Sequence, residues 1–424
     1  MENKTNVVII SDTSKDKDYV YLQEFISLCL TAGYKVLFVT SQNVNNVNIA
    51  TYLGSGFLQN TRDEIYANIE AEPEIKDNLI IATNFDLTGT QRANLKKFFD
   101  LEVVDRTFVI LKIFENNANS KEAKLQVDIA TLTWSKNHLI NKEGAFSQVT
   151  SGGGMHNKGS GEKKINLDKR HINLLIDAKK KELEKIKLAR KNSRTRRNNN
   201  PIPKVAIVGY TNSGKSTLIN ALMNFSHNEK TTLVKNQLFA TLETTTREIN
   251  KYGYMKFLLT DTVGFISNLP TTLVEAFKST LEEIKEADLL IHVVDFSNEN
   301  YENHIAITNQ ILEEIGVKDI PVIYSYNKCD ATSRSLSRLL NDNEMYCSLI
   351  KEEEIINVYR FICQGIASSW EVVELEFPFS EDYGSFCSDN YVIKSIKNKN
   401  GYQCTAYINP RTKHKYDYLI DICS

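Results

Sequence analysis

One stretch, residues 204–217, constrains the fold of this chain more than any other. It reads KVAIVGYTNSGKST: an apolar run, then Gly209, four further residues, Gly214-Lys215-Ser216, and the start of a helical pattern. Backbone N–H groups can surround a phosphate chain only where side chains are absent, which explains the two glycines. A strand, a glycine loop and a helix in this order predict a phosphate-binding loop in an α/β domain.

The residue types of this loop predict their roles. Lys215 would reach the terminal phosphates, and the Ser216 hydroxyl would bind Mg²⁺. The helix that opens at Lys215 adds the positive end of its dipole. The residues expected to hold the phosphates are Gly209, Tyr210, Thr211, Asn212, Ser213, Gly214, Lys215, Ser216 and Thr217.

Two later segments extend this phosphate site. In the threonine-rich stretch 239–247, one threonine should reach Mg²⁺ and the γ-phosphate, ordering the loop only in the triphosphate state. Asp261 follows a strand expected at 257–260 and would hold Mg²⁺ through its water shell, while the Gly264 N–H would sense the γ-phosphate. The binding residues expected here are Phe239, Ala240, Thr241, Leu242, Glu243, Asp261, Thr262, Val263 and Gly264.

A third segment predicts which base is bound. Asn327-Lys328-Cys329-Asp330 follows a strand expected at 322–326, and the Asp330 carboxylate can accept two hydrogen bonds from the N1–H and N2–H₂ groups of guanine. Adenine offers no such donor pair, and a buried unpaired carboxylate costs about 1–3 kcal/mol or more. We therefore expect a guanine nucleotide, with Ser348 and Leu349 supporting the guanine O6 atom through a backbone N–H.

Catalysis in such a site rests on positioning and charge stabilisation. Many GTPases orient the attacking water with a glutamine directly after the DxxG motif, and this chain has Phe265 there. Because phenylalanine cannot orient water, we expect slow intrinsic hydrolysis, on the order of 10⁻⁴ s⁻¹ as in an unaided Ras-type site. The missing element would come from elsewhere in the chain or from a partner.

The amino-terminal third predicts a second, open α/β sheet, because apolar strand-like runs alternate with helical spacing. Residues 106–134 continue as two helices that separate near Ser120, and residues 52–56 are expected to form a glycine loop. The tail reads as a small α+β region with strands at 372–377 and 402–409 and a third at 416–421. The expected amino-terminal strands are 6–11, 34–40 and 78–82, followed by a short extended segment at 102–104, and the helices are 19–31 and 91–99.

A glycine-rich stretch and a basic helix join the two halves. Residues 151–161 are typical of a mobile loop, for which a passive linker is favoured over a segment that orders on a partner. The helix expected at about 165–197 carries ten basic and two acidic residues in its second half, on a chain with net charge −2. This imbalance favours contact with an RNA backbone over a merely solvated face. Its expected apolar stripe is Leu167, His171, Leu174, Leu175, Leu183, Ile186 and Leu188.

Composition excludes several classes of protein. Hydrophobic residues make up 42% and charged residues 25%, as in an ordinary globular chain. The seven cysteines contain no CxxC pair, which favours reduced thiols over a disulfide framework or a zinc site. There is no signal-peptide pattern and no apolar run near 18 residues, so we expect no membrane span and a cytoplasmic location.

Taken together, GYTNSGKST, FATLETTTR, LLTDTVGFISNLP and NKCD resemble the motifs of the HflX GTPases, and so do residues 87–134 and 159–172 outside the nucleotide domain. The resemblance implies an N-terminal α/β domain with a helical hairpin and a Ras-like P-loop domain. The expected domains are 1–150 (N-terminal α/β), 151–200 (glycine-rich loop and basic helical linker), 201–368 (Ras-like) and 369–424 (small α+β).

The same resemblance implies roles for residues and a partner. Thr241 would be the switch threonine, so the metal ligands would be Ser216, Thr241 and Asp261 and the catalytic residues Lys215, Thr241 and Gly264. Phe265 matches the hydrophobic replacement of glutamine in this family. The implied activity is GTP hydrolysis coupled to binding of the large ribosomal subunit and rRNA near the peptidyl-transferase region, with splitting of stalled ribosomes by a protein expected to be a monomer.

This sequence departs from the family pattern at three places. Residues 159–166 read GSGEKKIN where GPGETQLE is usual, Phe57 replaces a lysine, and Ser348-Leu349 replaces Ser-Ala. The details of ribosome contact, and ATP as a second nucleotide at the N-terminal domain, therefore stay open. Two alternatives also stay open: a nucleotide-gated ribosome- or RNA-binding factor with negligible hydrolysis, and a GTPase of another circuit such as tRNA modification or membrane traffic.

Overall fold

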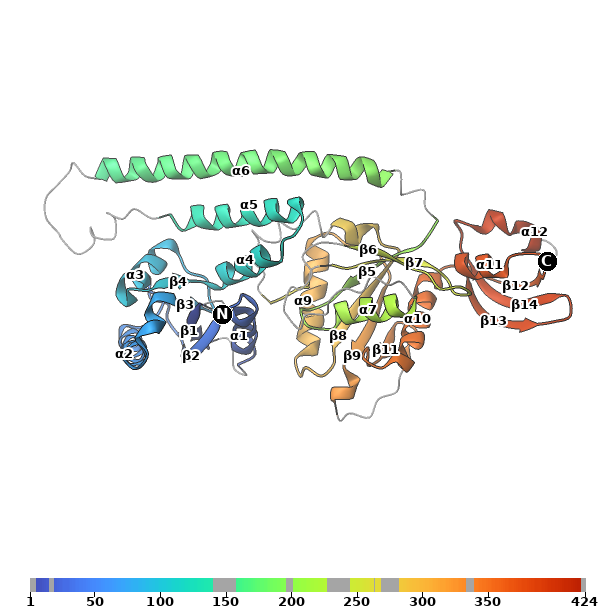
Figure 1. The fold of residues 1–424 in the computed structure, drawn as a ribbon, viewed down its shortest axis with the longest axis horizontal. Helices are drawn as coiled ribbons and strands as arrows, with labels where there is room; N and C mark the ends of the chain where they lie inside the picture. Colours follow the sequence, from blue (N-terminus) through green and yellow to red (C-terminus); the bar gives the residue numbers. More distant parts are fainter. Residues whose placement is uncertain are drawn as a thin grey trace. The chain divides into compact units, whose positions relative to one another are not determined.

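A computed structural model describes residues 5–14, 19–139, 158–195, 201–226, 245–262, 264–267, 282–332 and 339–420 (Figure 1). The chain forms two compact units. The first comprises Met1–Lys191 with Leu269–Ala276, and the second comprises Asn192–Asn268 with Phe277–Ser424. The α/β class expected from the sequence is confirmed. No helix in these ranges is both long and apolar enough to cross a membrane.

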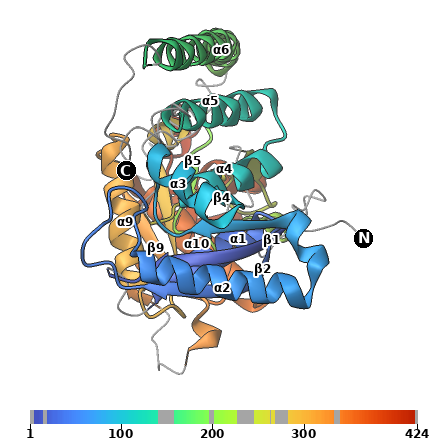
Figure 2. The same ribbon diagram turned by 90° about the vertical axis from the view of Figure 1, so that its left-hand side faces the viewer.

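The first unit is built on a four-stranded parallel sheet of order β2-β1-β3-β4. Two helices, α2 and α3, pack on the face that carries Val8 and Ile10, and α2 lies in front of the strands in Figure 2. The strands are β1 (Asn6–Asp12), β2 (Lys35–Gln42), β3 (Leu79–Thr83) and β4 (Glu102–Val104), and the helices are α1 (Val20–Thr31), α2 (Ser55–Ala71), α3 (Gly89–Phe99) and the 3-10 turn η1 (Pro73–Asn78).

The glycine loop expected at 52–56 is wrong at residues 55 and 56, which lie in helix α2; residues 52–54 precede the helix. Gly54 is its N-cap and Ser55 and Gly56 belong to its first turn. Leu58, Thr61 and Ile65 recur at helical spacing and are buried, so the burial of this face outweighs the poor helix propensity of glycine.

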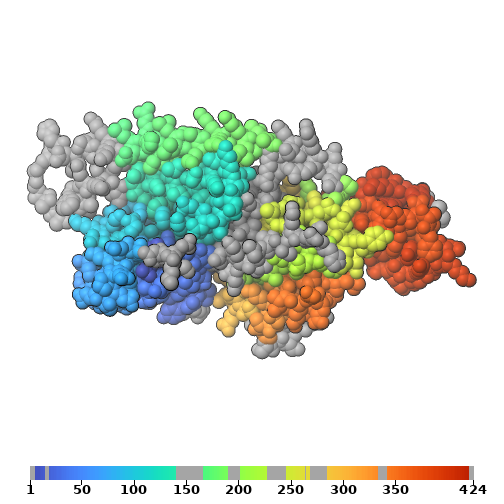
Figure 3. Space-filling model, viewed as in Figure 1, coloured from blue at the N-terminus to red at the C-terminus, as the bar shows by residue number. Residues whose placement is uncertain are grey.

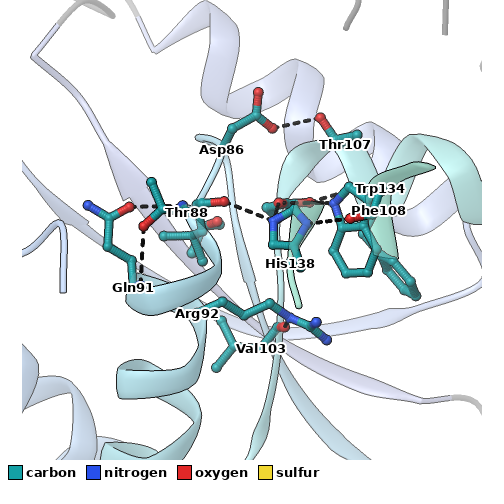
Figure 4. A network of polar contacts seen from close by, with 12 residues as sticks. Asp86, Thr88, Gln91, Arg92, Val103, Thr107, Phe108, Trp134 and His138 are labelled. Carbon is teal, nitrogen blue, oxygen red and sulfur yellow. Dashed lines mark hydrogen bonds and ion pairs between the residues drawn. The ribbon is translucent and has the colours of Figure 1, made fainter. Parts of the chain in front are cut away.

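Two further helices, α4 (Arg106–Asn117) and α5 (Lys121–Asn137), separate at Ser120 as expected. Ser120 caps α5 by accepting a hydrogen bond from the Ala123 N–H at 3.1 Å. Asp105 caps α4 through the Phe108 N–H and also accepts the Trp134 indole N–H at 3.1 Å (Figure 4).

His138 closes this polar network at the end of α5. Its ring nitrogens lie 2.8 Å from the Trp134 carbonyl and 2.9 Å from the Leu87 carbonyl, and Nε2 lies 3.2 Å from the Asp105 carboxylate (Figure 4). Burial opposes charge on the ring, but the bonds to Asp105 and to the two carbonyls outweigh it and raise the pKa of His138. A protonated ring can donate from both nitrogens, which suits acceptors on both sides.

Helix α6 (Lys158–Thr195) packs along α5. It begins earlier than expected: residues 158–161 are helical, so the loop expected at 151–161 is wrong there, while residues 151–157 lie outside the described ranges. Two ion pairs, each at 2.6 Å, join the helices: Lys121 with Glu182 and Lys179 with Asp128.

The apolar stripe of α6 also differs from expectation. The side chains that face α5 are Ile172, Ile176, Leu183 and Ile186, whereas His171, Leu167, Leu174, Leu175 and Leu188 are exposed. Residues 174 and 176 lie about 200° apart around a helix, so a stripe through one cannot include the other. Of the expected stripe, Leu183 and Ile186 do face α5. Figure 3 shows the side chains of α6, in green, lying along those of α5, in teal.

The second unit contains a seven-stranded sheet of order β10-β11-β9-β8-β5-β7-β6, parallel from β11 to β7. The carboxyl ends of its parallel strands therefore meet at one edge, where ligands bind in such sheets. The strands are β5 (Lys204–Val208), β6 (Thr246–Ile249), β7 (Phe257–Thr260), β8 (Leu289–Asp295), β9 (Val322–Asn327), β10 (Leu339–Asn341) and β11 (Glu344–Tyr346), with helices α7 (Lys215–Phe225), α9 (Tyr301–Glu314) and α10 (Glu352–Ala367) and 3-10 turns η3 (Glu282–Glu286) and η4 (Cys329–Ala331).

A small three-stranded antiparallel sheet of order β12-β14-β13 completes this unit. The third strand expected at 416–421 is wrong: residues 417–420 form the helix α12, Asp421 lies outside the described residues, and residues 391–397 supply the strand instead. The elements are β12 (Glu371–Pro378), α11 (Tyr383–Asp389), β13 (Tyr391–Lys397), β14 (Gly401–Ile408), η5 (Lys413–Lys415) and α12 (Asp417–Ile420).

Residues next to the strands of this small sheet are bonded near the amino-terminal ends of the large sheet's strands. Arg411 bonds both carboxylate oxygens of Asp288, one of which also accepts the Lys204 N–H at 2.8 Å. Lys256 lies 3.1 Å from the buried carboxylate of Asp389. These contacts lie near the amino-terminal ends of the strands, whereas the sequence motifs lie at the carboxyl-terminal edge.

Candidate nucleotide-binding site

The loop between β5 and α7 has a shape that only its glycines permit. Gly209 and Gly214 have φ angles of 147° and 106°, in the region that side chains disfavour. A Cβ on Gly209 would lie 2.3 Å from the Val293 carbonyl oxygen, and one on Gly214 would lie 2.1 Å from Asn327 Nδ2. The backbone is thus held close to its neighbours, as a cradle for phosphate requires.

Lys215 is aimed into this loop. Its side chain is buried, and Nζ donates to the carbonyls of Gly209 at 3.0 Å and Tyr210 at 2.6 Å. Burial lowers the pKa of Lys215 to about 8, although the Asp261 carboxylate opposes the shift; Lys328 adds to it. An anion near Nζ would therefore be strongly favoured, since it would replace the water that this cation lacks.

The loop also holds unused hydrogen-bonding capacity. The hydroxyls of Ser213 and Thr211 are buried and have no hydrogen-bond partner among the described residues. Buried polar groups are rarely left unpaired unless a ligand or water meets them. The glycine cradle, the buried cation and these hydroxyls together fit a phosphate chain.

The segment after β7 is paired to this loop. The Phe265 N–H donates to the Gly209 carbonyl at 3.2 Å, and the Phe265 carbonyl accepts the Thr211 N–H at 2.8 Å. Gly264 lies so close that a Cβ there would sit 2.9 Å from Lys215 Nζ. The Phe265 side chain is 2% exposed, so it is a core residue and cannot hold a water for attack.

The expected base-binding residues come together at the ends of β9 and β11. Asn327 donates to the Ser213 carbonyl at 2.9 Å and accepts the Leu349 N–H at 3.1 Å. The Ser348 hydroxyl donates to the Asp330 carboxylate at 2.6 Å. The phosphate loop, the NKCD segment and the Ser348-Leu349 segment are therefore one hydrogen-bonded assembly.

Oxygen donors suited to Mg²⁺ are present in this assembly. Ser216 lies in the first turn of α7, and the buried Asp261 directly follows β7. Hard oxygen ligands of this kind are what Mg²⁺ takes, usually with several waters. No cluster of three or more His, Cys, Asp or Glu residues that could hold a metal occurs in the ranges that the structure describes.

The remaining predicted residues divide into two groups. Asn212 is exposed with a φ of 61°, Thr217 lies in α7, Thr262 donates to the Ile207 carbonyl at 2.5 Å, and Cys329 donates its N–H to the Cys347 carbonyl at 3.3 Å. Lys328 also has a left-handed φ and bonds Asp295 at 2.6 Å. Outside the described ranges lie Phe239, Ala240, Thr241, Leu242, Glu243 and Val263.

Sequence reasoning missed three residues at this site. Asp295 ends β8 opposite Asn327 of β9, a register that its place at the end of a predicted strand could have suggested. His292 is buried within β8, and burial together with the positive charge of Lys215 lowers its pKa to about 3. His304 of α9 stacks on the Tyr210 ring, with centroids 3.8 Å apart; no local sequence signal links these two.

The chain resembles known proteins both in family models and in overall sequence. Residues 204–328 match the family model described as 50S ribosome-binding GTPase, residues 20–115 match GTP-binding GTPase N-terminal, and residues 117–197 match GTP-binding GTPase Middle Region. The chain is similar to the GTPase HflX of Caldanaerobacter subterraneus subsp. tengcongensis, at 35% identity over 97% of this chain and 93% of the relative. It is also similar to that of Lacrimispora saccharolytica, at 37% identity over 86% of this chain and 84% of the relative.

A solved structure is also similar. The GTP-binding protein of the archaeon Sulfolobus solfataricus, crystallised with GDP, has 24% sequence identity and a TM-score of 0.47. The match covers 86% of this chain and 99% of the archaeal one.

Proposed function

This chain belongs to the HflX family of GTPases, and from that premise we propose that it hydrolyses GTP with Mg²⁺ on the large ribosomal subunit and thereby dissociates stalled or inactive ribosomes. The observation that supports the nucleotide part best is the bonded assembly of Ser213, Asn327, Asp330 and Ser348. It links the phosphate loop to a carboxylate of the type that selects guanine.

The chain's own residues account for binding. Phosphates would replace the Gly209 and Tyr210 carbonyls as partners of Lys215 Nζ, and the buried Ser213 hydroxyl would gain a partner. Ser216, Thr241 and Asp261 would hold Mg²⁺, which would supply positive charge to neutralise the phosphates. Lys215, Thr241 and Gly264 are proposed to stabilise the charge that develops on the γ-phosphate.

The buried Phe265 supports a slow intrinsic rate. Its ring is packed in the core and its backbone is paired to the phosphate loop, so it supplies no polar group to an attacking water. We propose that the ribosome supplies or orders that missing group. The same observation favours the second candidate, a nucleotide-gated ribosome-binding factor with negligible hydrolysis.

Helix α6 supports contact with rRNA. Lys180, Lys181, Lys185 and Lys187 are exposed, with Glu184 as their exposed acidic neighbour. Lys179 and Glu182 are instead paired to α5. Exposed cations along one helix suit the phosphate backbone of RNA. A protein that acts on ribosomes is proposed to be cytoplasmic, and we propose that it is a monomer. Binding of ATP at the N-terminal domain stays a prediction.

The decisive experiment measures GTP turnover by the full chain, alone and with purified large ribosomal subunits, using Lys215→Ala as the blank. Strong stimulation that the blank lacks would support the proposal. Tight GTP binding without stimulation would favour the gated factor. Light scattering of intact ribosomes in the same mixtures tests splitting directly.

The base specificity has its own test. Asp330→Asn replaces an acceptor pair by one acceptor and one donor, so GTP affinity should fall about 10- to 100-fold, as for a lost bond between a charged group and its partner. Xanthosine triphosphate, which carries an acceptor in place of the N2 amine, should bind the variant better than the parent. Equal loss for both nucleotides would mean that Asp330 does not face the base.

A further inference from the structure

We propose that the side chain of Tyr210 is a positioning residue that holds the segment after the DxxG motif on the phosphate loop, and so sets the preference for GTP over GDP. The proposal rests on the proposed GTP binding and adds to it a residue whose side chain no binding motif explains. The residues that support it lie in the phosphate loop, in residues 264–267 and in α9.

Tyr210 makes two contacts that the phosphate loop does not need for its own shape. Its hydroxyl accepts the Ser267 N–H at 2.7 Å, in a buried setting. Its ring stacks on His304, with ring planes 4° apart and centroids 3.8 Å apart. The stack fixes the ring, and the fixed ring places the hydroxyl under the Ser267 amide.

The hydroxyl continues a backbone pairing. Phe265 exchanges hydrogen bonds with the loop on either side of Tyr210, through the Gly209 carbonyl and the Thr211 N–H. The Tyr210–Ser267 bond extends this attachment by two residues along the chain. Phe265 and Ser267 are therefore both hydrogen-bonded to the phosphate loop.

This attachment reaches the residue expected to sense the γ-phosphate. Gly264 precedes Phe265 and lies against Lys215 and Thr211. The Gly209 carbonyl accepts bonds from both Lys215 Nζ and the Phe265 N–H. A third phosphate that attracts Lys215 thus meets a Gly264 already held beside it, whereas GDP gains nothing from Gly264.

Holding a binding group in place before the ligand arrives raises affinity, because less freedom is lost on binding. Without the Tyr210 hydroxyl, the buried Ser267 N–H loses this acceptor, and the attached conformation becomes less populated. The loss should fall on GTP, since only GTP reaches Gly264.

The test is Tyr210→Phe, which keeps the ring and its stack. Equilibrium binding of a non-hydrolysable GTP analogue and of GDP, each with Mg²⁺, should show the analogue weakened about five- to tenfold, the factor that one such hydrogen bond is worth. GDP affinity should stay within about twofold. Equal weakening of both ligands, or of neither, would overturn the proposal.

A second measurement does not depend on nucleotide binding. Hydrogen exchange of the nucleotide-free chain should show faster exchange at residues 265–267 in Tyr210→Phe than in the parent. If exchange there is unchanged, the attachment does not exist, whatever the nucleotide data show. If exchange is faster but neither nucleotide binds the parent, the proposed GTP function fails while the attachment stands.

Matched variants isolate the two contacts. Tyr301→Phe removes a hydroxyl that bonds the exposed Glu302 on the same helix as His304, and should change neither readout. His304→Ala should reproduce part of the GTP-specific loss, and His304→Phe, which keeps an aromatic face, should restore it. Equal behaviour of the two His304 variants would remove the stack from the proposal.

Discussion

The four-stranded and the seven-stranded sheets share a topology around their central strand but differ in the residues that lie beyond its carboxyl end. In each, a central strand lies between neighbours that follow it in the chain: β1 between β2 and β3, and β5 between β7 and β8. Each arrangement places a crevice beyond the carboxyl end of that strand. What differs is whether side chains or backbone line it.

Beyond β1, side chains satisfy the polar groups. Asp12 accepts the N–H groups of Ser14 and Val44 and the hydroxyl of Tyr52, while the Asn84 amide bonds Ser11 and Asp12. Beyond β5, glycines leave the backbone bare, and Lys215 bonds the loop's own carbonyls. The topology therefore offers a place for a ligand, and the residues at the strand end decide whether one can enter.

The largest effect should come from filling the bare loop. Gly209→Ala places a Cβ against the Val293 carbonyl at a left-handed φ, so binding of GTP and GDP should fall beyond detection by calorimetry, with a loss of about 2 kcal/mol or more in unfolding free energy. Gly56→Ala is the matched control, because its Cβ would meet nothing within 4 Å and α2 should gain about 0.5–1 kcal/mol. Retained nucleotide binding by Gly209→Ala would contradict the cradle.

A smaller effect should come from a change in the polar side chains beyond β1. Asp12→Ala leaves two N–H groups and a hydroxyl without their acceptor, so the first unit should lose about 1–3 kcal/mol in chemical denaturation. GTP affinity should be unchanged, since the second unit carries the phosphate loop. A parallel fall in GTP affinity would show that the two crevices are coupled.

The effect that is smallest near neutral pH distinguishes the two units through the half-buried His138 and the buried His292. The pKa of His138 is raised, so its stabilisation is fully present below the unfolded pKa near 6.5 and is lost as pH rises through the folded pKa. The pKa of His292 is lowered to about 3, so its neutral folded form loses stability as pH falls from about 6.5 toward 3. In thermal unfolding, His292→Gln should remove a rise of stability with pH between about 3 and 6.5, and His138→Gln should remove a fall of stability with pH above about 6.5. Slopes of the same sign would contradict this assignment.

The two crevices were not equally predictable from the sequence. The crevice beyond β5 could be predicted from a short stretch of sequence, because Gly209, Gly214 and Lys215 stand at fixed spacing between a strand and a helix. The filled one depends on Asp12, Tyr52 and Asn84, which are distant in sequence and carry no shared spacing. Contacts of that kind follow from the fold, so they become visible only with it.

The same contrast explains the errors in secondary structure. Glycines at 54 and 56 indicated a loop, but the burial of Leu58 and Ile65 decides for α2. The leucines of α6 suggested a buried stripe, yet Leu167, Leu174 and Leu188 lie on another face of the helix than Ile176 and Leu183, which face α5. In both places a tertiary partner, absent from any local window, chose the outcome.

The pairing of Arg411 with Asp288 has a consequence for the nascent chain during synthesis. Asp288 and the Lys204 N–H that it accepts belong to the large sheet, but Arg411 lies 123 residues beyond Asp288. Chains are made from the amino end, and domains fold as they emerge. Until residues 409–411 have been synthesised, Asp288 and the Pro201 carbonyl therefore lack these partners. The contacts of Asn409 and Arg411 with the large sheet can therefore form only after the nucleotide loop has been synthesised.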